Sequence, residues 1–152
     1  MKKILFVCHG NICRSPMAEF MMKKLVADAG LSEDFYIESA AVSREEIGND
    51  MHYGAREMLT RKGIPFSSRE ARQITKDDYK NFDLLIGMDI SNLYRMQKFW
   101  ENDPDSKVKL LLTYAGKDRD IADPWYTHNF DDTWRDLEEG LTALLKALTK
   151  EQ

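Results

Sequence analysis

The chain has 152 residues, of which 43% are hydrophobic and 32% are charged, and its formal net charge is −4. This length suits one domain with a sizeable core, so we expect a single domain over residues 1–152. The acidic balance argues against a nucleic-acid surface or an anionic-membrane binder, and no stretch has the length and apolarity of a membrane span.

The two cysteines, Cys8 and Cys13, lie close together in one predicted turn. Small secreted domains usually carry a framework of disulfides, and two neighbouring cysteines do not make one. Met1–Lys3 followed by apolar residues is similar to the start of a secretory signal, but the apolar run stops at Cys8 and Arg14 soon follows. We therefore expect a cytoplasmic protein.

The first third of the chain predicts a strand, a helix and a second strand. Lys3–Cys8 is an apolar run typical of a buried strand, and the apolar spacing after it predicts a helix over Ser15–Ala29, stopped by Gly30. Alternating β-forming residues predict a strand over Phe35–Val42, which leads into a polar loop, Ser43–Asn49.

The middle of the chain continues this alternation. A second helix passes through Met58 and ends at Gly63. Thr75–Asp78 has the form of a capping box that opens a short helix. Leu84–Met88 is apolar throughout, which is typical of a strand buried on both faces.

The last third predicts two more helices and one more strand. Asp89 or Ser91 caps a helix, and Val108–Leu112 is another buried strand. Thr113–Asn129 shows no regular period, and a loop this long in a compact domain is usually functional. A final amphipathic helix is predicted over Phe130–Leu148.

Strands that alternate with helices predict an α/β domain with a four-stranded parallel sheet and helices on both faces. In such sheets ligands bind beyond the carboxyl ends of the strands. We therefore expect four loops to share one rim: Cys8–Ser15, Ser43–Asn49, the residues around Asp89, and Thr113–Asn129.

The segment Val7–Pro16, VCHGNICRSP, joins the first strand to the first helix. A helix N-terminus presents unpaired N–H groups that bind anions; Gly10 gives the turn backbone freedom, and Pro16 suits a first helical position. The same field favours a thiolate, which makes Cys8 a candidate nucleophile, and Arg14 offers a fork matched to phosphate oxygens.

Together with Asp123–Tyr126 (DPWY), the segment Val7–Pro16 resembles the low-molecular-weight protein tyrosine phosphatase family. The similarity extends through Ser39–Ala41, Ala71–Gln73 and Met88–Leu93, so it covers nearly the whole chain. The resemblance implies a flavodoxin-like three-layer sandwich and hydrolysis of phosphotyrosine without a metal or other cofactor.

In this chemistry Cys8 attacks phosphorus and becomes a phosphocysteine, Arg14 holds the phosphoryl oxygens, and Asp123 serves as general acid and then base. The resemblance also implies that Asn11 holds the loop in shape and that Ser15 supports the thiolate. The candidate binding residues are His9, Gly10, Asn11, Ile12, Cys13 and Ser15, with Trp125 and Tyr126 against the substrate ring.

Each of these residues has a plainer interpretation. A cysteine at a strand end is commonly a buried hydrophobe, and an arginine in a first helical turn is commonly solvated. Asp123 could be a turn residue before proline, and Trp125 and Tyr126 could be core aromatics.

The remaining cysteine and the histidines have other possible roles. Cys13 either packs behind the loop or forms a reversible protective disulfide with Cys8. His9 could line the rim, and it is not expected to bind a metal. His52 and His128 lack metal-ligand spacing with the cysteines and are expected at the surface.

The loop after the second strand departs from the family pattern. Many relatives carry an aromatic there, whereas this chain reads SREEIG over Ser43–Gly48. Glu45 and Glu46 predict a preference for neutral or basic sequence around the phosphotyrosine, unless they are merely solvated. Relatives also often have a loop-supporting histidine where Arg69–Arg72 (REAR) stands here.

Other functions fit the same turn less well. An arsenate reductase needs further cysteines, and none follows Cys13. A phosphate-binding redox protein would be expected to carry the Cys-x-x-Cys spacing, which is absent, and a non-catalytic phosphate-binding module would not need Asp123. The expected partners are phosphotyrosine proteins and phosphate or other oxyanions, and we expect a monomer or weak dimer.

Overall fold

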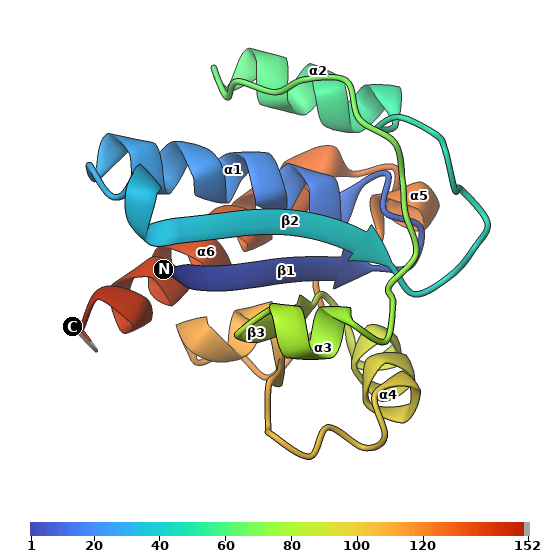
Figure 1. Cartoon of the computed structure of the whole chain (residues 1–152). Helices are drawn as coiled ribbons and strands as arrows, with labels where there is room; N and C mark the ends of the chain where they lie inside the picture. Colours follow the sequence, from blue (N-terminus) through green and yellow to red (C-terminus); the bar gives the residue numbers. More distant parts are fainter. Residues whose placement is uncertain (151–152) are drawn as a thin grey trace.

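The computed structural model describes residues 1–150 and contains one parallel sheet (Figure 1). Its four strands are β1 (Lys2–Cys8), β2 (Phe35–Ala41), β3 (Leu84–Gly87) and β4 (Val108–Leu110), in the order β2-β1-β3-β4. The predicted four-stranded α/β fold is confirmed. Because β1 connects to β2 on one side and lies beside β3 on the other, the loop after β1 begins where the strand order reverses.

Helices cover both faces of the sheet (Figure 1). One layer contains α1 (Arg14–Asp28), α2 (Tyr53–Arg61) and α6 (Phe130–Lys150), and the other contains α3 (Asp78–Asn81) and α4 (Ile90–Phe99). Side chains of β1 alternate between the two cores: Ile4 and Phe6 pack on the α1 side, and Leu5 and Val7 on the α4 side.

The fourth strand is shorter than predicted. It ends at Leu110, and the chain continues as a 3₁₀ helix, η2 (Leu111–Ala115). Leu111 and Leu112 are both buried on the α6 side, which a strand with side chains on alternate faces cannot achieve for consecutive residues. Gly140 of α6 permits this approach, because a Cβ there would lie 2.6 Å from Leu111 Cγ.

Two further short elements lie in segments where no helix or strand was predicted. The 3₁₀ helix η1 (Ser32–Asp34) precedes β2, and α5 (Pro124–Thr127) lies inside the segment Thr113–Asn129 that was expected to be irregular. Pro124 is well placed at the first position of α5, where no N–H partner is needed.

The predicted helix caps form. Thr75 N donates to Asp78 Oδ2 at 2.8 Å and Asp78 N donates to Thr75 Oγ1 at 3.2 Å, although regular helix begins only at Asp78. Asp89, and not Ser91, caps α4, with Asn92 completing a capping box. This cap fixes Asp89 at the carboxyl end of β3.

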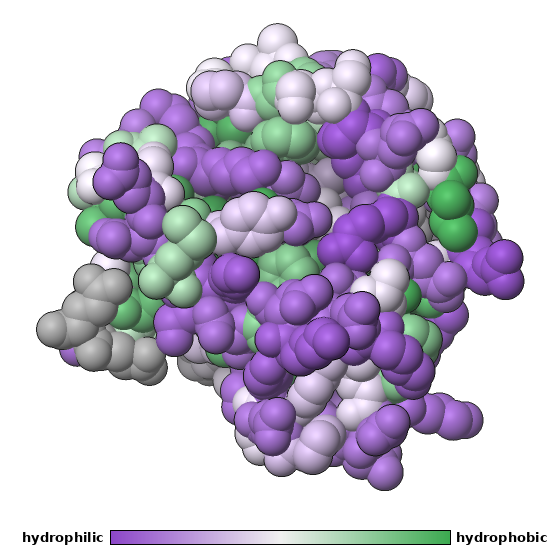
Figure 2. Space-filling view, in the orientation of Figure 1, coloured by the Kyte–Doolittle hydropathy of each residue, from purple (hydrophilic) through white to green (hydrophobic). Residues whose placement is uncertain are grey.

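The surface seen in Figure 2 is predominantly hydrophilic, with small separate apolar areas. Among residues 1–150, no helix is both long enough and apolar enough to cross a membrane.

Candidate active site

The loop between β1 and α1, which we call the anion loop (Cys8–Ser15), directs its carbonyl groups outward. Four of them accept hydrogen bonds from neighbouring segments. Val42 N donates to Cys8 O (3.0 Å) and Ser43 N donates to His9 O (3.1 Å). His52 N donates to Ile12 O (2.8 Å) and Arg69 Nη2 donates to Asn11 O (2.6 Å). Within residues 1–150, the backbone N–H groups of residues 10–14 donate to no backbone oxygen. These amides are therefore available to an anion on the inner side of the loop.

Asn11 braces the loop from within. It is fully buried and adopts a left-handed backbone (φ 60°), a conformation that asparagine tolerates better than most residues. Its Nδ2 donates to Ser15 Oγ at 2.8 Å, and its Oδ1 accepts from Arg69 Nη2 at 2.5 Å and Arg72 N at 3.2 Å. Arg69 thus supplies the support that relatives often obtain from a histidine at this place, a role that sequence reasoning missed.

Replacing Arg69 with alanine is expected to lower kcat for an aryl phosphate by about 10- to 100-fold, because a loosened loop misplaces the nucleophile and the amides. Steady-state kinetics and inhibition by inorganic phosphate measure the effect. We expect kcat to fall and the inhibition constant for phosphate to rise together. Arg69→His is expected to recover part of the loss.

Arg135→Ala, an exposed arginine on α6, is the matched control and should change neither value. Unchanged phosphate inhibition in Arg69→Ala would show that Asn11 keeps the loop in shape without this arginine.

Cys8 lies at the end of β1 with only 3% of its surface exposed. Its Sγ is 3.1 Å from Ser15 Oγ and 3.4 Å from Ser15 N, which donates to it. Ser15 lies in the first turn of α1, so its bond to the sulfur shows that the positive end of the helix faces Cys8. Because α1 begins at Arg14, Pro16 is its third residue and not its first as predicted.

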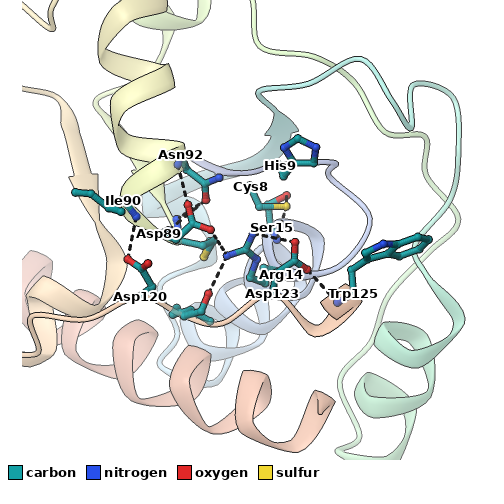
Figure 3. Close-up of polar contacts among 12 residues, drawn as sticks. Cys8, His9, Arg14, Ser15, Asp89, Ile90, Asn92, Asp120, Asp123 and Trp125 are labelled. Carbon is teal, nitrogen blue, oxygen red and sulfur yellow. Dashed lines mark hydrogen bonds and ion pairs between the residues drawn. The ribbon is translucent and has the colours of Figure 1, made fainter. Parts of the chain in front are cut away.

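Arg14 is almost entirely buried, at 2% exposure, so the interpretation as a solvated surface arginine is wrong. Nη1 donates to Asp89 Oδ2 at 2.7 Å and to the Ile121 carbonyl oxygen at 2.8 Å, while Nη2 lies 3.4 Å from Asp123 Oδ2 (Figure 3). Among the side chains of residues 1–150, Arg14 Nε is a buried donor without a partner.

Burial alone lowers the pKa of Arg14, but the neighbouring negative charges of Cys8, Asp123 and Asp89 outweigh it and raise the pKa. The guanidinium therefore stays charged, and Asp89 holds it from the side away from Asp123. The sequence analysis placed Asp89 in a helix cap and on the shared rim, but it did not identify Asp89 as the partner of Arg14. The position of Asp89 directly after β3, at the rim where ligands bind, is the sequence feature that could have indicated this role.

Asp123 is a turn residue before proline and also lines the pocket. Its Oδ1 caps α5 by accepting from Trp125 N at 3.0 Å, and its Oδ2 faces Arg14. The preceding segment is fixed by two bonds, Ile121 N to Met88 O (2.9 Å) and Ile90 N to Asp120 Oδ1 (2.9 Å). The turn that Asp-Pro makes is thus what brings a carboxylate to the pocket.

The pocket at this rim is lined by the anion loop, by Glu45 and Glu46, and by Asp123, Trp125 and Tyr126. Loops after β1, β2 and β4 line this pocket, and Asp89 after β3 reaches it through Arg14, so the expected convergence of the four loops is confirmed. Trp125 and Tyr126 are 52% and 77% exposed, so neither is a core aromatic. Of the predicted site residues, Cys8, His9, Gly10, Ile12, Cys13 and Arg14 line the pocket, while Asn11 and Ser15 lie behind it.

His9 connects the anion loop to both neighbouring segments of the rim. Its Nδ1 lies 3.1 Å from Arg95 Nη1 of α4, and its Nε2 lies 2.8 Å from Glu45 Oε2. Because arginine can only donate, Nδ1 accepts and Nε2 donates to the carboxylate. Glu46 accepts from Asn49 Nδ2 at 2.7 Å, so both rim carboxylates have protein partners and are not simply solvated.

His52 corrects the expectation of a surface residue. It is half-buried and caps α2, with its Nδ1 accepting from Gly54 N at 3.0 Å. His128 is exposed as expected and ends α5 in a left-handed conformation. Within residues 1–150, no three or more His, Cys, Asp or Glu side chains are grouped so that they could hold a metal ion.

A sequence model described as low molecular weight phosphotyrosine protein phosphatase matches residues 3–152. The chain belongs to this family. The low molecular weight protein-tyrosine-phosphatase YfkJ of Bacillus subtilis is 39% identical over 155 residues, covering 100% of this chain and 99% of YfkJ. The human low molecular weight phosphotyrosine protein phosphatase is 44% identical over 133 residues, covering 86% of this chain and 84% of its own.

Solved structures agree with the family assignment. The crystal structure of YfkJ matches with a TM-score of 0.96, covering 100% of this chain and 97% of that one. The structure of DARP, a Drosophila arginine phosphatase, matches with a TM-score of 0.89 at 31% identity, covering 97% and 98%. This low-molecular-weight phosphatase is therefore a hydrolase with phosphorylated substrates, and the resemblance found in its sequence is confirmed.

Peroxide is expected to convert Cys8 to a sulfenic acid, which then condenses with the Cys13 thiol, releases water and forms a disulfide. Burial raises the pKa of Cys13, and the charges of Cys8 and Asp123 raise it further, so Cys13 stays protonated and is not oxidised first. Peptide mass spectrometry before and after dithiothreitol measures the bond. In Cys13→Ser, Cys8 should instead proceed to irreversible acids; the same acids in the wild type would contradict the disulfide.

Proposed function

We propose that this phosphatase hydrolyses phosphotyrosine in proteins, and small aryl phosphates, through a phosphocysteine on Cys8. The observation that carries the proposal is the anion loop: its amides at residues 10–14 have no backbone acceptor, and the unpartnered Arg14 Nε joins them around one thiol. A phosphoryl group would satisfy these donors, because buried polar groups are costly to leave unpaired.

In the first step, the Cys8 thiolate attacks phosphorus and the phosphorus–oxygen bond to the phenol breaks. Arg14 Nε and Nη2 and the loop amides donate to the three equatorial oxygens, where negative charge concentrates. Asp123, whose Oδ2 faces Arg14 at 3.4 Å, gives its proton to the departing phenolate.

In the second step, Asp123 takes a proton from water as the water attacks phosphorus. The sulfur–phosphorus bond breaks, phosphate leaves, and Cys8 returns as the thiolate, stabilised by the Ser15 hydroxyl at 3.1 Å and the Ser15 N–H at 3.4 Å. Trp125 and Tyr126, exposed at the pocket edge, form the walls against the substrate ring.

Asp123→Asn tests the general acid. We expect kcat to fall by about 10²- to 10⁴-fold for a phosphotyrosine peptide and much less for an aryl phosphate with a good leaving group, since that phenolate departs without a proton.

The assay is run with EDTA present, and phosphoarginine and arsenate are included as competing substrates. Equal losses for both leaving groups would contradict the acid role. Turnover of phosphoarginine alone would replace the phosphotyrosine assignment with the activity named for DARP. Reduction of arsenate would favour the reductase alternative, although no cysteine follows Cys13 to relay electrons.

We further propose a single catalytic domain over residues 1–152 that works in the cytoplasm as a monomer or weak dimer. Residues 3–152 match one family model, and both cysteines are free, as a thiolate mechanism requires. Light scattering coupled to gel filtration measures the oligomeric state.

A further inference from the structure

We propose that a groove beside the catalytic pocket binds an arginine or lysine side chain that flanks the phosphotyrosine of the substrate. We call it the flanking groove; it lies between α2, α5 and the start of α6. Residues that line it include His52, Tyr53, Glu57, Trp125, Phe130 and Asp131. The proposal rests on the proposed function, because it assigns a second contact to the same phosphopeptide.

The flanking groove adjoins the catalytic pocket at Trp125, which lines both. Trp125 is 52% exposed, and in Figure 3 its ring extends from α5 away from Arg14. A peptide whose phosphotyrosine ring packs on one side of Trp125 can therefore place a neighbouring residue on the other side, since an extended chain advances about 3.3 Å per residue.

Aromatic rings form a preorganised wall of this groove. The His52 ring stacks with Tyr53 at 4.6 Å and with Phe130 at 5.4 Å, and meets the Trp125 ring edge-on at 5.9 Å. The contact with Phe130 requires Gly54, because a Cβ there would lie 2.4 Å from Phe130 Cε2.

The wall is also fixed to the anion loop. His52 N donates to Ile12 O at 2.8 Å, and the His52 ring caps α2 by accepting from Gly54 N. The rings of the groove are thus held at a constant distance from the phosphate position. A site that is already ordered loses less conformational entropy when a side chain binds.

The charges of the groove select a cation. The Glu57 side chain is exposed and, within residues 1–150, makes no hydrogen bond or ion pair. Asp131 lies 3.7 Å from Arg61, and both are more than half exposed, so that pair is weak and open to exchange. The groove thus holds two carboxylates, Glu57 and Asp131, and one guanidinium, Arg61. The carboxylates offer ionic contacts to an arginine or lysine, and the 69% exposed ring of Tyr53 offers a cation–π contact.

The test compares matched phosphotyrosine peptides that carry arginine, alanine or glutamate at each position within about three residues of the phosphotyrosine. At one of these positions, wild-type kcat/KM should favour arginine over glutamate by roughly three- to tenfold at low salt. Glu57→Gln should reduce this preference, and Glu57→Arg should reverse it. Tyr53→Ala should weaken it, while Tyr53→Phe retains it.

Two controls separate the groove from other causes. Glu33→Gln, on η1 at the opposite end of β2, should behave as wild type with every substrate. Glu46→Gln, at the rim of the catalytic pocket, should still prefer arginine over glutamate at the same peptide position as the wild type. A preference that is insensitive to Glu57→Gln, or that disappears in Glu46→Gln alone, overturns the proposal.

Turnover of an aryl phosphate, measured in parallel, distinguishes failure of the proposed function from failure of the groove proposal alone. If the wild type turns over neither the aryl phosphate nor any peptide, the proposed function fails and the groove proposal fails with it. If it turns over all peptides equally well, the phosphatase function stands and only the flanking groove is wrong.

Discussion

Replacing Cys8 with serine is expected to lower kcat by about 10⁴-fold or more for both aryl phosphates and phosphotyrosine peptides. A serine hydroxyl fits the buried place of the thiol and can keep the contact with Ser15, so the loop should retain its shape. What is lost is the nucleophile, because a serine hydroxyl is a far weaker acid than a cysteine thiol and stays protonated.

Rapid acid quenching of the wild type should trap a phosphoryl group on Cys8, which peptide mapping identifies, and Cys8→Ser should carry none. Cys13→Ser provides the comparison, since Cys13 lines the same pocket and should lose far less activity while still forming the intermediate. Phosphorylation of another residue in the wild type, or near-normal turnover in Cys8→Ser, would contradict a phosphocysteine mechanism.

The second large effect is expected at Arg14. Arg14→Lys should lower kcat/KM by about 10³-fold, a loss comparable to removing a transition-state arginine in other phosphoryl-transfer enzymes. Lysine keeps one positive charge but loses the planar fork. In this structure Nη1 is already committed to Asp89 and the Ile121 carbonyl, so only Nε and Nη2 remain to bind the phosphoryl group. One ammonium cannot serve both sets of contacts.

Thermal unfolding separates loss of binding from loss of fold. Inorganic phosphate should raise the Tm of the wild type, because it binds only the folded protein, and should raise that of Arg14→Lys much less. Arg119→Lys, an exposed arginine paired with Asp136, is the matched control and should behave as wild type. Retained phosphate binding with turnover within tenfold of the wild type would rule out the assigned role of the fork.

The candidate site residues lie together as predicted where they are close in sequence. Cys8, the loop glycine and Arg14 stand within one strand-to-helix turn, so chain connectivity alone brings the thiol, the amides and the guanidinium together. The alternation of apolar runs with helical periods likewise identified all four strands and the longer helices within a few residues of their observed ends.

Predictions failed where burial by a distant element changed the local structure. Val108–Leu112 has the composition of a strand, yet Leu111 and Leu112 turn into a 3₁₀ helix because α6 offers a surface for both side chains. His52 carries no sequence signal of burial, and two of its three aromatic neighbours, Trp125 and Phe130, come from α5 and α6, far along the chain.

The sequence by itself therefore determined the candidate site's core, a thiol and an arginine in an amide-lined turn. It also determined the α/β domain whose loops share one rim. Only the tertiary structure decided which of many carboxylates and arginines support that centre. Asp89 and the Ile121 carbonyl hold Arg14, and Arg69 holds Asn11, across separations of 75, 107 and 58 residues. Such pairings depend on strand order, register and the reach of long side chains, none of which a local pattern encodes.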